Sequence, residues 1–575
     1  MMKVAKKKII ENRFFAKWRF YVVYGFIFSA VLGLVLKLAL LQLVDSERLI
    51  TEGDKRSIRY QNVGVPRAMI VDRNGRALAV SVPMYDVWAD PKVILESDGI
   101  DVNDLKWQEL AKSLSIPIAT LEQKLTLKSL RFVYLAKQIT PTNADYLKKL
   151  KLPGVYFERT SKRYYPVGES TAQLIGLTNI DKSVESGAEG IEKSYNTWLI
   201  GESGQRVVRR DRFGRVIEEL ERVDSEIAAD LILSIDERLQ SLVYKELAQA
   251  VYFNKADSGT AVLVDVRTGE ILAMATNPSY NPNNRAQIDS SLLRNRAVTD
   301  AFEPGSTVKP LVVMAALEKK VADLNTVIDT RPFYVNRYEV KDVSYQKSLN
   351  LAGILEKSSN VGVSKLALQM KPSELVEFYS RFGLGQSTEL GIGGESSGKI
   401  GANRTRWSDI ERATYSFGYG LMVTPLQLAR AYATIGSYGV YKPVSILKIN
   451  EPVKGLRVVD EKTAKTVVKL MEAVAVSGGG TKASVPGYSV AVKTGTAKKL
   501  GSNGKYINQY IAYTAGIAPA TKPRYSLVVI VDNPKSGQYY GGTVSAPIFS
   551  RIMGGVLRIM NVEPDKELDN QMIIY

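Results

Sequence analysis

The stretch that decides the fold is EPGSTVKP at residues 303–310, followed by the apolar run LVVMAAL at residues 311–317. Proline and glycine punctuate its start, and seven consecutive apolar residues predict a helix buried on all sides. Ser306 and Lys309 are three residues apart, so on a helix their side chains share one face. Burial lowers the pKa of a lysine and so creates a neutral base that can take a serine proton. The stretch predicts an activated serine at the start of a buried helix.

The S-x-x-K pattern alone is not decisive, because it begins again at Ser344, Ser396, Ser445 and Ser502. Composition narrows the chemistry. The 575 residues include no histidine and no cysteine. A Ser-His-Asp triad, a cysteine nucleophile and a zinc site of His or Cys ligands are therefore excluded. A hydrolase or acyltransferase made from this chain must use lysine, carboxylate, tyrosine or hydroxyl as its base, which favours a lysine–serine pair.

The net charge of +18 could indicate a nucleic-acid partner. However, the chain has no zinc-finger spacing, no basic heptad region and no RNA-binding aromatic signature. We therefore interpret the charge as a solvated basic surface and expect no nucleic acid, no metal and no cofactor.

An uncharged stretch of 17 residues, 20–36, continues after Lys37 into the apolar run 38–44. This length is enough to span a bilayer. The 19 preceding residues carry seven lysines and arginines against one acid, Glu11. The positive-inside rule therefore predicts a cytoplasmic tail at 1–19 and a transmembrane signal anchor at 20–44, with everything after it outside the cytoplasm. No small-residue cleavage site follows closely, so we expect an uncleaved, single-pass anchor.

Two further units are expected beyond the anchor. Residues 45–225 alternate short β-like runs with turns such as Asn74-Gly75, and we interpret them as a stalk and an elongated, β-rich pedestal (dimerisation-like) domain. Residues 226–575 combine strands and helices. We expect a strand at 231–235, a helix at 236–251 with Asp236 as its N-cap, and a hairpin about Thr268-Gly269. The predicted fold class is α/β (α+β), in which helices cover a mostly antiparallel sheet.

Two more motifs follow the serine in order. Ser358-Ser359-Asn360 stands where a helical stretch at 351–357 ends, 52 residues after Ser306. Lys493-Thr494-Gly495-Thr496 follows the predicted strand 488–492, and it is the chain's one K-T-G, 135 residues after Ser358. Gly495 removes a side chain where another group must approach the strand closely.

These ordered motifs are those of penicillin-binding proteins and class A β-lactamases. The chain resembles the class B penicillin-binding proteins over nearly its whole length, and it is most similar to the D,D-transpeptidases of the division septum. The resemblance extends to DRNG at 72–75, RYYP at 163–166, EGIE at 189–192, FGYGLMVTPLQLA at 417–429 and YYGGTVSAP at 539–547. The first pedestal motif also includes Arg67, and Ala68 departs from the family, which usually has glycine after this arginine.

The resemblance implies roles for the first two motifs. Ser306 would attack the carbonyl between the two terminal D-alanines of a peptidoglycan stem peptide and form an acyl-enzyme. Lys309 would be the base for that attack. Ser358 would relay a proton to the departing amine, and Asn360 would hydrogen-bond the stem peptide or Lys309.

The third motif would bind the substrate. Lys493, Thr494 and Thr496, with Gly495 between them, would hold the substrate carboxylate by charge-assisted hydrogen bonds. The backbone N–H groups of Ser306 and Thr496 would form an oxyanion hole. Four tyrosines would either line the cleft or pack in the core: Tyr419, Tyr506, Tyr510 and Tyr513. An amine of a neighbouring stem would then displace the serine and form a cross-link, whereas a β-lactam antibiotic would stay attached.

The resemblance also implies a bacterial inner-membrane location with a periplasmic catalytic domain, and partnership with the septal glycosyltransferase FtsW and other division proteins. Two alternatives stay open: an elongation-type class B transpeptidase and a β-lactam-binding scaffold without synthesis. A class A β-lactamase is disfavoured because no Glu-x-x-x-Asn sequence lies between residues 361 and 492. A bifunctional class A enzyme needs a histidine, and sensors of this group have several membrane spans.

Overall fold

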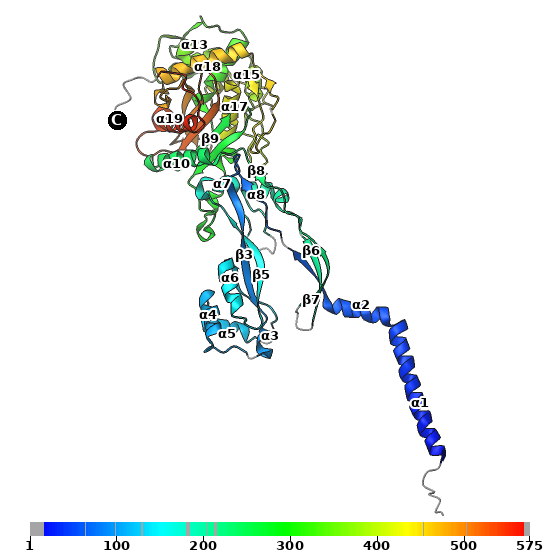
Figure 1. Cartoon of the computed structure of the whole chain (residues 1–575). Helices are drawn as coiled ribbons and strands as arrows, with labels where there is room; N and C mark the ends of the chain where they lie inside the picture. Colours follow the sequence, from blue (N-terminus) through cyan, green and yellow to red (C-terminus); the bar gives the residue numbers. More distant parts are fainter. Residues whose placement is uncertain are drawn as a thin grey trace, which may run out of the picture. The chain divides into compact units, whose positions relative to one another are not determined.

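The computed structural model describes residues 17–63, 65–97, 99–127, 130–179, 185–202, 204–211, 216–451, 453–501 and 503–567. Most of the predicted tail at 1–19 lies outside the described residues. The chain divides into two compact units (Figure 1). One comprises Met1–Val65 and Ser203–Glu226, and the other comprises Pro66–Glu202 and Ile227–Tyr575.

The first unit contains the apolar helix α1 (Lys17–Ala39), which continues into the π-helical turn η1 (Leu40–Val44). Of the described residues, Lys17–Val44 alone forms a helical stretch long and apolar enough to cross a membrane, and its apolar side chains are not buried in the protein. This helix fits a single-pass membrane anchor. The unit also contains α2 (Ser46–Ser57) and an antiparallel sheet of β1 (Ile58–Val63), β6 (Gly204–Arg210) and β7 (Val216–Val223).

The second unit begins with a five-stranded sheet. Its order is β4 (Val133–Ile139), β3 (Ala77–Ala89), β2 (Ile70–Val71) and β8 (Leu231–Ile232), and β5 (Val155–Tyr164) pairs with β3. The predicted Asn-Gly turn joins β2 to β3, with Gly75 at φ +83°. Helices around this sheet are α3 (Pro91–Glu96), α4 (Leu105–Ser113), α5 (Ile118–Leu125), α6 (Pro141–Lys149), α7 (Ala172–Ile175), α8 (Gly190–Ser194) and α9 (Asn196–Leu199).

Sequence patterns misplace two strands. Residues 231–235 were expected to open the second domain as a strand, but β8 has only two residues and pairs in parallel with β2. Beyond Ile232 the backbone pairs with another segment, because Leu233 forms an isolated bridge with Leu447 and the N–H of Ser234 donates to the Ile446 carbonyl. Asp236 then caps the next helix, α10 (Glu237–Phe253). The strand expected at 488–492 begins instead at Ala491, because Val485 and Tyr488 close a tight bridge before it.

The large sheet of the second unit has the order β10-β9-β19-β18-β17, with every neighbouring pair antiparallel. Its strands are β9 (Ser258–Asp265), β10 (Ile271–Asn277), β17 (Ala491–Leu500), β18 (Tyr506–Ala518) and β19 (Tyr525–Asp532). Ser526 on β19 donates to a carbonyl of α17 (Pro425–Gly436), whereas Thr514 on β18 contacts α19 (Gly541–Ile559). These two residues point to opposite faces of the sheet. Helices therefore cover both faces, and the predicted fold class is confirmed.

The remaining elements surround this sheet. They are α11 (Arg296–Thr299), the 3₁₀ turn η5 (Gly305–Val308), α12 (Lys309–Glu318), β11 (Val327–Asp329), β12 (Phe333–Val335), β13 (Tyr338–Val340), β14 (Ser348–Asn350), α13 (Leu351–Glu356), α14 (Asn360–Ala367), α15 (Pro372–Arg381), α16 (Asp409–Ser416), β15 (Val440–Tyr441), β16 (Leu456–Arg457) and α18 (Glu461–Val476). Helix α12 is buried along most of its length, as the apolar run predicts.

A buried ion cluster joins three of the sequence motifs in the first part of this unit. Glu192 accepts hydrogen bonds of 2.6 Å from Arg67 Nε and 2.6 Å from Arg163 Nε. All three side chains are buried. The neighbouring Ala68 is also buried, and its N–H donates to the carbonyl of Leu199. One carboxylate therefore compensates two buried guanidinium groups.

We predict that Glu192→Gln destabilises the protein by about 3–5 kcal/mol, because both buried arginines lose the carboxylate that they contact. A urea denaturation midpoint measured by tryptophan fluorescence checks this. The control is Asp145→Ala, which breaks an exposed pair with Lys148 and should cost at most about 1 kcal/mol. Equal effects of the two substitutions would contradict the role given to the cluster.

Candidate active site

Ser306 lies in the 3₁₀ turn η5, immediately before α12. The sequence predicts a single helix here, and the difference is local. A 3₁₀ helix has three residues per turn, so residues i and i+3 still lie one above the other. Lys309 is the first residue of α12 and is fully buried, whereas Ser306 is partly exposed. Pro310 follows in the first turn, as predicted.

Gly305 fixes the approach of this turn to the sheet. Its φ is +49°, and a Cβ on it would lie 2.0 Å from the hydroxyl oxygen of Tyr513 on β18. Tyr513 is fully buried, and its hydroxyl donates to the carbonyl of Glu303. Because Gly305 has no side chain, the turn η5, which carries Ser306, packs directly against the large sheet.

The second motif forms the junction of two helices. Ser358 follows α13 with φ +57°, and Ser359 caps α14 by accepting a hydrogen bond of 2.8 Å from the N–H of Gly362. Asp342 secures the junction, because its carboxylate accepts hydrogen bonds of 2.5 Å from Ser359 Oγ and 2.9 Å from the N–H of Val361. This contact was not predicted from the sequence.

The third motif lies on β17, the edge strand of the large sheet. Lys493 is buried, and Gly495 pairs with Tyr513 on β18. A Cβ on Gly495 would lie 1.9 Å from the Tyr513 ring. The close approach predicted at this glycine is therefore made by a tyrosine ring of the neighbouring strand.

The three motifs meet at the hydroxyl of Ser358. Its Oγ lies 3.0 Å from Ser306 Oγ, 3.2 Å from Lys309 Nζ and 2.9 Å from Lys493 Nζ. Lys309 Nζ also donates to the Ser358 carbonyl at 2.6 Å and to Asn360 Oδ1 at 2.7 Å. Although Ser306 and Lys309 share one side of the turn, the hydrogen bonds of the described residues connect them through Ser358.

Electrostatics favour a neutral amine in this cluster. The pKa of Lys309 lies well below its usual value because of burial and, next, because of the neighbouring Lys493 charge, while Asp342 acts in the opposite direction. Burial lowers the pKa of Lys493 to about 7. Two lysines therefore flank one hydroxyl, and the partners of both amines within the described part of the chain are neutral oxygens.

Thr494 and Thr496 lie on the same strand as Lys493. The hydroxyl of Thr494 donates to the Gly479 carbonyl at 3.4 Å. Thr496 Oγ1 accepts a hydrogen bond of 2.9 Å from the N–H of Gly541, so its own hydrogen stays available for another acceptor. All eight residues predicted for the site thus belong to one cluster and its edge strand.

Comparison with known proteins identifies a family whose motifs are those that meet in this site. A family described as "Penicillin binding protein transpeptidase domain" matches residues 259–554, and one described as "Penicillin-binding Protein dimerisation domain" matches residues 62–233. The peptidoglycan D,D-transpeptidase FtsI of Escherichia coli (strain K12) is 57% identical, covering 97% of this chain and 95% of its own. The chain belongs to the class B penicillin-binding proteins.

Two further relatives of this class B penicillin-binding protein cover most of its length. The peptidoglycan D,D-transpeptidase FtsI of Buchnera aphidicola subsp. Schizaphis graminum is 49% identical over 98% of this chain and 99% of its own. The crystal structure of a peptidoglycan synthetase from Bifidobacterium adolescentis has a TM-score of 0.69 and 28% identity, and covers 89% of this chain and 98% of its own.

Four tyrosines were candidates for lining the cleft of the penicillin-binding domain. Tyr513 instead belongs to the core, and Tyr510 stacks on Tyr539 with 4.1 Å between the ring centroids. Tyr419 and Tyr506 meet edge to face, with centroids 5.8 Å apart. The Tyr506 hydroxyl contacts the carboxylate of Glu303, a residue that the sequence analysis did not single out.

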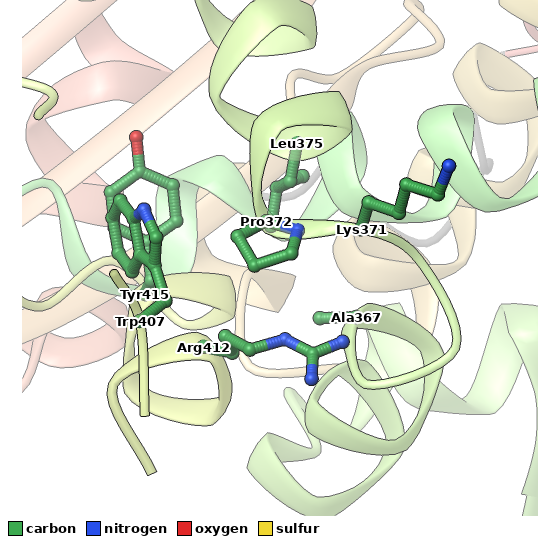
Figure 2. A pocket seen from close by; sticks show the side chains of 7 residues that line it. All are labelled: Ala367, Lys371, Pro372, Leu375, Trp407, Arg412 and Tyr415. Atoms are coloured by element: carbon green, nitrogen blue, oxygen red, sulfur yellow. The ribbon is translucent and has the colours of Figure 1, made fainter. Parts of the chain in front are cut away.

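The penicillin-binding domain also has a small pocket that is separate from the cluster around Ser358. Its lining residues are Ala367, Lys371, Pro372, Leu375, Trp407, Arg412 and Tyr415. Figure 2 shows the rings of Trp407 and Tyr415 on one side and Lys371 pointing away from them. Ala367 ends α14, whose first residue is Asn360, so about 10 Å of helix separates the two. The pocket includes none of the predicted site residues.

We predict that Asp342→Asn moves the rising limb of the pH–rate profile for penicillin acylation to lower pH. The predicted base must be neutral to accept a proton, and loss of the nearby negative charge lowers the pKa of Lys309 further. Stopped-flow acylation rates across pH test this.

Glu339→Gln is the matched control, because Glu339 lies on the same hairpin and pairs with the exposed Lys341. Its profile should not move. The Asp342→Asn protein could instead acylate more slowly at every pH while the rising limb stays at the same pH. That result would mean that Asp342 acts only as a structural cap.

Proposed function

We propose that this chain is a peptidoglycan D,D-transpeptidase that cross-links stem peptides of the septal cell wall through an acyl-enzyme on Ser306. The observation that carries the proposal is the contact series Ser306 Oγ–Ser358 Oγ–Lys309 Nζ, with distances of 3.0 and 3.2 Å. Membership of the class B penicillin-binding proteins and the two FtsI relatives support the same reaction.

The hydrogen bonds of Lys309 support its role as the base. Its two shortest contacts, 2.6 and 2.7 Å, go to carbonyl oxygens that can only accept. A neutral amine has two N–H groups and one lone pair, so these contacts use both of its hydrogens. The lone pair then points towards the third neighbour, the Ser358 hydroxyl, which can donate. The proton of Ser306 would pass to Ser358 while the Ser358 proton passes to Lys309.

In the first half-reaction, Ser306 Oγ attacks the carbonyl carbon between the two terminal D-alanines. The C–O bond forms, the C–N bond breaks, and the proton held by Lys309 returns through Ser358 to the leaving amine of D-alanine. Ser306 is the second residue of η5, so its N–H has no partner within the helix and can stabilise the oxyanion together with the N–H of Thr496.

The carboxylate of the substrate would lie against Lys493, Thr494 and Thr496. Binding this anion stabilises the charged form of Lys493, whose own burial disfavours it. A charged Lys493 in turn lowers the pKa of Lys309. Substrate binding therefore helps to keep the base neutral while the anchoring lysine carries the proton. In the second half-reaction, an amine of another stem displaces Ser306.

The cellular setting is part of the proposal. We infer an anchor at 20–44 with a cytoplasmic tail at 1–19, a pedestal domain at 45–225 and a periplasmic catalytic domain at 226–575, in the bacterial inner membrane. FtsW and other division proteins would be its partners. Loss of a septal enzyme should give long undivided cells, whereas loss of an elongation enzyme should give rounded ones, and depletion distinguishes the two.

We predict that penicillin adds one drug mass to the protein, on the peptide that contains Ser306. Ser306→Ala should abolish both the adduct and the cross-linking of stem peptides, because the nucleophile is removed. Intact-mass and peptide mass spectrometry check the adduct, and cross-linked dimers of stem peptide report turnover.

Ser344→Ala is the matched control, since Ser344 begins another S-x-x-K sequence and is exposed. It should keep a full adduct. An adduct that persists in Ser306→Ala would contradict the assignment of the nucleophile. Rapid release of hydrolysed penicillin by the unmodified protein would favour a β-lactamase instead.

A further inference from the structure

Glu303, three residues before the nucleophile, is a buried carboxylate without a cationic partner. Its residue is 9% exposed. Oε1 accepts hydrogen bonds from the N–H of Gly420 at 2.9 Å and from the Tyr506 hydroxyl at 3.1 Å, and Oε2 lies 3.0 Å from the same hydroxyl. Both donors are neutral, and no ion pair involves Glu303 among the described residues. Buried acids are rarely left in this state.

The side chains around this carboxylate suit a cation. Tyr506 and Tyr419 meet edge to face beside it, at an interplanar angle of 80°. Tyr506 is 49% exposed, so the group opens to solvent. Aromatic rings attract ammonium groups, and a carboxylate adds a charge-assisted hydrogen bond. We call Glu303, Tyr419 and Tyr506 the acidic tyrosine corner.

The acidic tyrosine corner adjoins the serine turn. The N–H of Gly305 donates to the carbonyl of Gly418 at 3.1 Å, and a Cβ on Gly418 would lie 2.1 Å from the Gly305 carbonyl oxygen. The segment that carries Tyr419 is therefore packed against the turn that carries Ser306. A cation bound at the acidic tyrosine corner would therefore approach Ser306 from the side on which the Tyr419 segment packs.

We propose that the acidic tyrosine corner binds the ammonium form of the amine that acts as acceptor in the second half-reaction. The inference rests on the proposed function, because it concerns the acceptor of that same acyl-enzyme. It assigns a ligand class, a primary ammonium group, to residues outside the three motifs. The corner shares no residue with the predicted carboxylate site, Lys493–Thr496 on β17, so donor and acceptor stems would be recognised by different residues.

Attack by the acceptor amine on the acyl-enzyme needs a group that takes a proton from the ammonium ion. The acceptor arrives as an ammonium ion and must lose one proton before its nitrogen can attack the acyl carbon. The new C–N bond then forms, the C–O bond to Ser306 breaks, and the nitrogen loses a second proton, which the serine oxygen takes up. The first proton, accepted by Glu303 and passed on to solvent, is the one released in total. Burial raises the pKa of the Glu303 carboxyl, which makes it a better proton acceptor than an exposed glutamate.

If Glu303 only supported the neighbouring loop through hydrogen bonds, its negative charge would not be needed. An amide oxygen in Glu303→Gln can accept the same hydrogen bond from the N–H of Gly420. The substitution removes the negative charge while the volume stays nearly the same. Glu303→Gln therefore separates recognition of an ammonium group from support of the loop.

The experiment measures how one acyl-enzyme partitions between nucleophiles. The full-length protein in detergent is acylated by a thioester of a D-alanyl peptide, and the products of hydrolysis, of aminolysis by D-alanine and of methanolysis are quantified together. D-alanine carries an ammonium group, whereas methanol is uncharged. Each ratio to hydrolysis comes from a single acyl-enzyme pool, so it does not depend on the rate of acylation.

We expect Glu303→Gln to lower the ratio of aminolysis to hydrolysis about tenfold, as loss of one charge-assisted hydrogen bond implies, while the methanolysis ratio stays unchanged. Glu377→Gln, at an exposed position on α15, should alter neither ratio. An unchanged aminolysis ratio, or an equal fall in both ratios, would overturn the inference. Failure to form any acyl-enzyme on Ser306 in the unmodified protein would instead refute the proposed function.

Discussion

The whole site depends on two buried lysines that share one hydroxyl. Lys309 and Lys493 both contact Ser358 Oγ, and neither has a carboxylate partner among the residues that the structure describes. Burial of an unpaired ammonium group is costly, and the proteins that tolerate it lower the pKa of the group instead. The pKa of Lys493 is about 7, and that of Lys309 is depressed as well. In the proposed mechanism, this lowering of the pKa gives a histidine-free chain a neutral amine, Lys309, to act as the base.

The fold keeps this arrangement in place with three separate contacts. Tyr513 fills the space left by Gly305 and Gly495, so one buried ring sets the distance between the serine turn and the edge strand. Asp342 holds the start of α14 and thus the position of Ser358. Because β17 is an edge strand, its second side pairs with no strand of the described residues, which is where the proposed mechanism places the substrate.

Local patterns predicted much of this from sequence. The helix after Ser306, the Asn-Gly turn before β3 and the Asp236 cap of α10 depend on near neighbours, and all were predicted correctly. The order and type of the motif residues indicated the site. The sequence could not predict that β19 lies between β9 and β18, that Tyr513 packs on Gly495, or that Asp342 and Glu303 belong to the site. These contacts join residues 17 to 274 positions apart, from Asp342 with Ser359 to Asp532 with Ser258, and no local pattern reports them.

The state of the two lysines can be measured directly. In the full-length protein with ¹³C-enriched lysine, NMR titration of the Cε signals should show two lysines that titrate far below the rest. One of these signals should be absent in Lys309→Arg and the other in Lys493→Arg. If every lysine titrates near the ordinary value of about 10.4, the amine of Lys309 is charged at neutral pH and cannot be the base. That result would contradict the account of the active site.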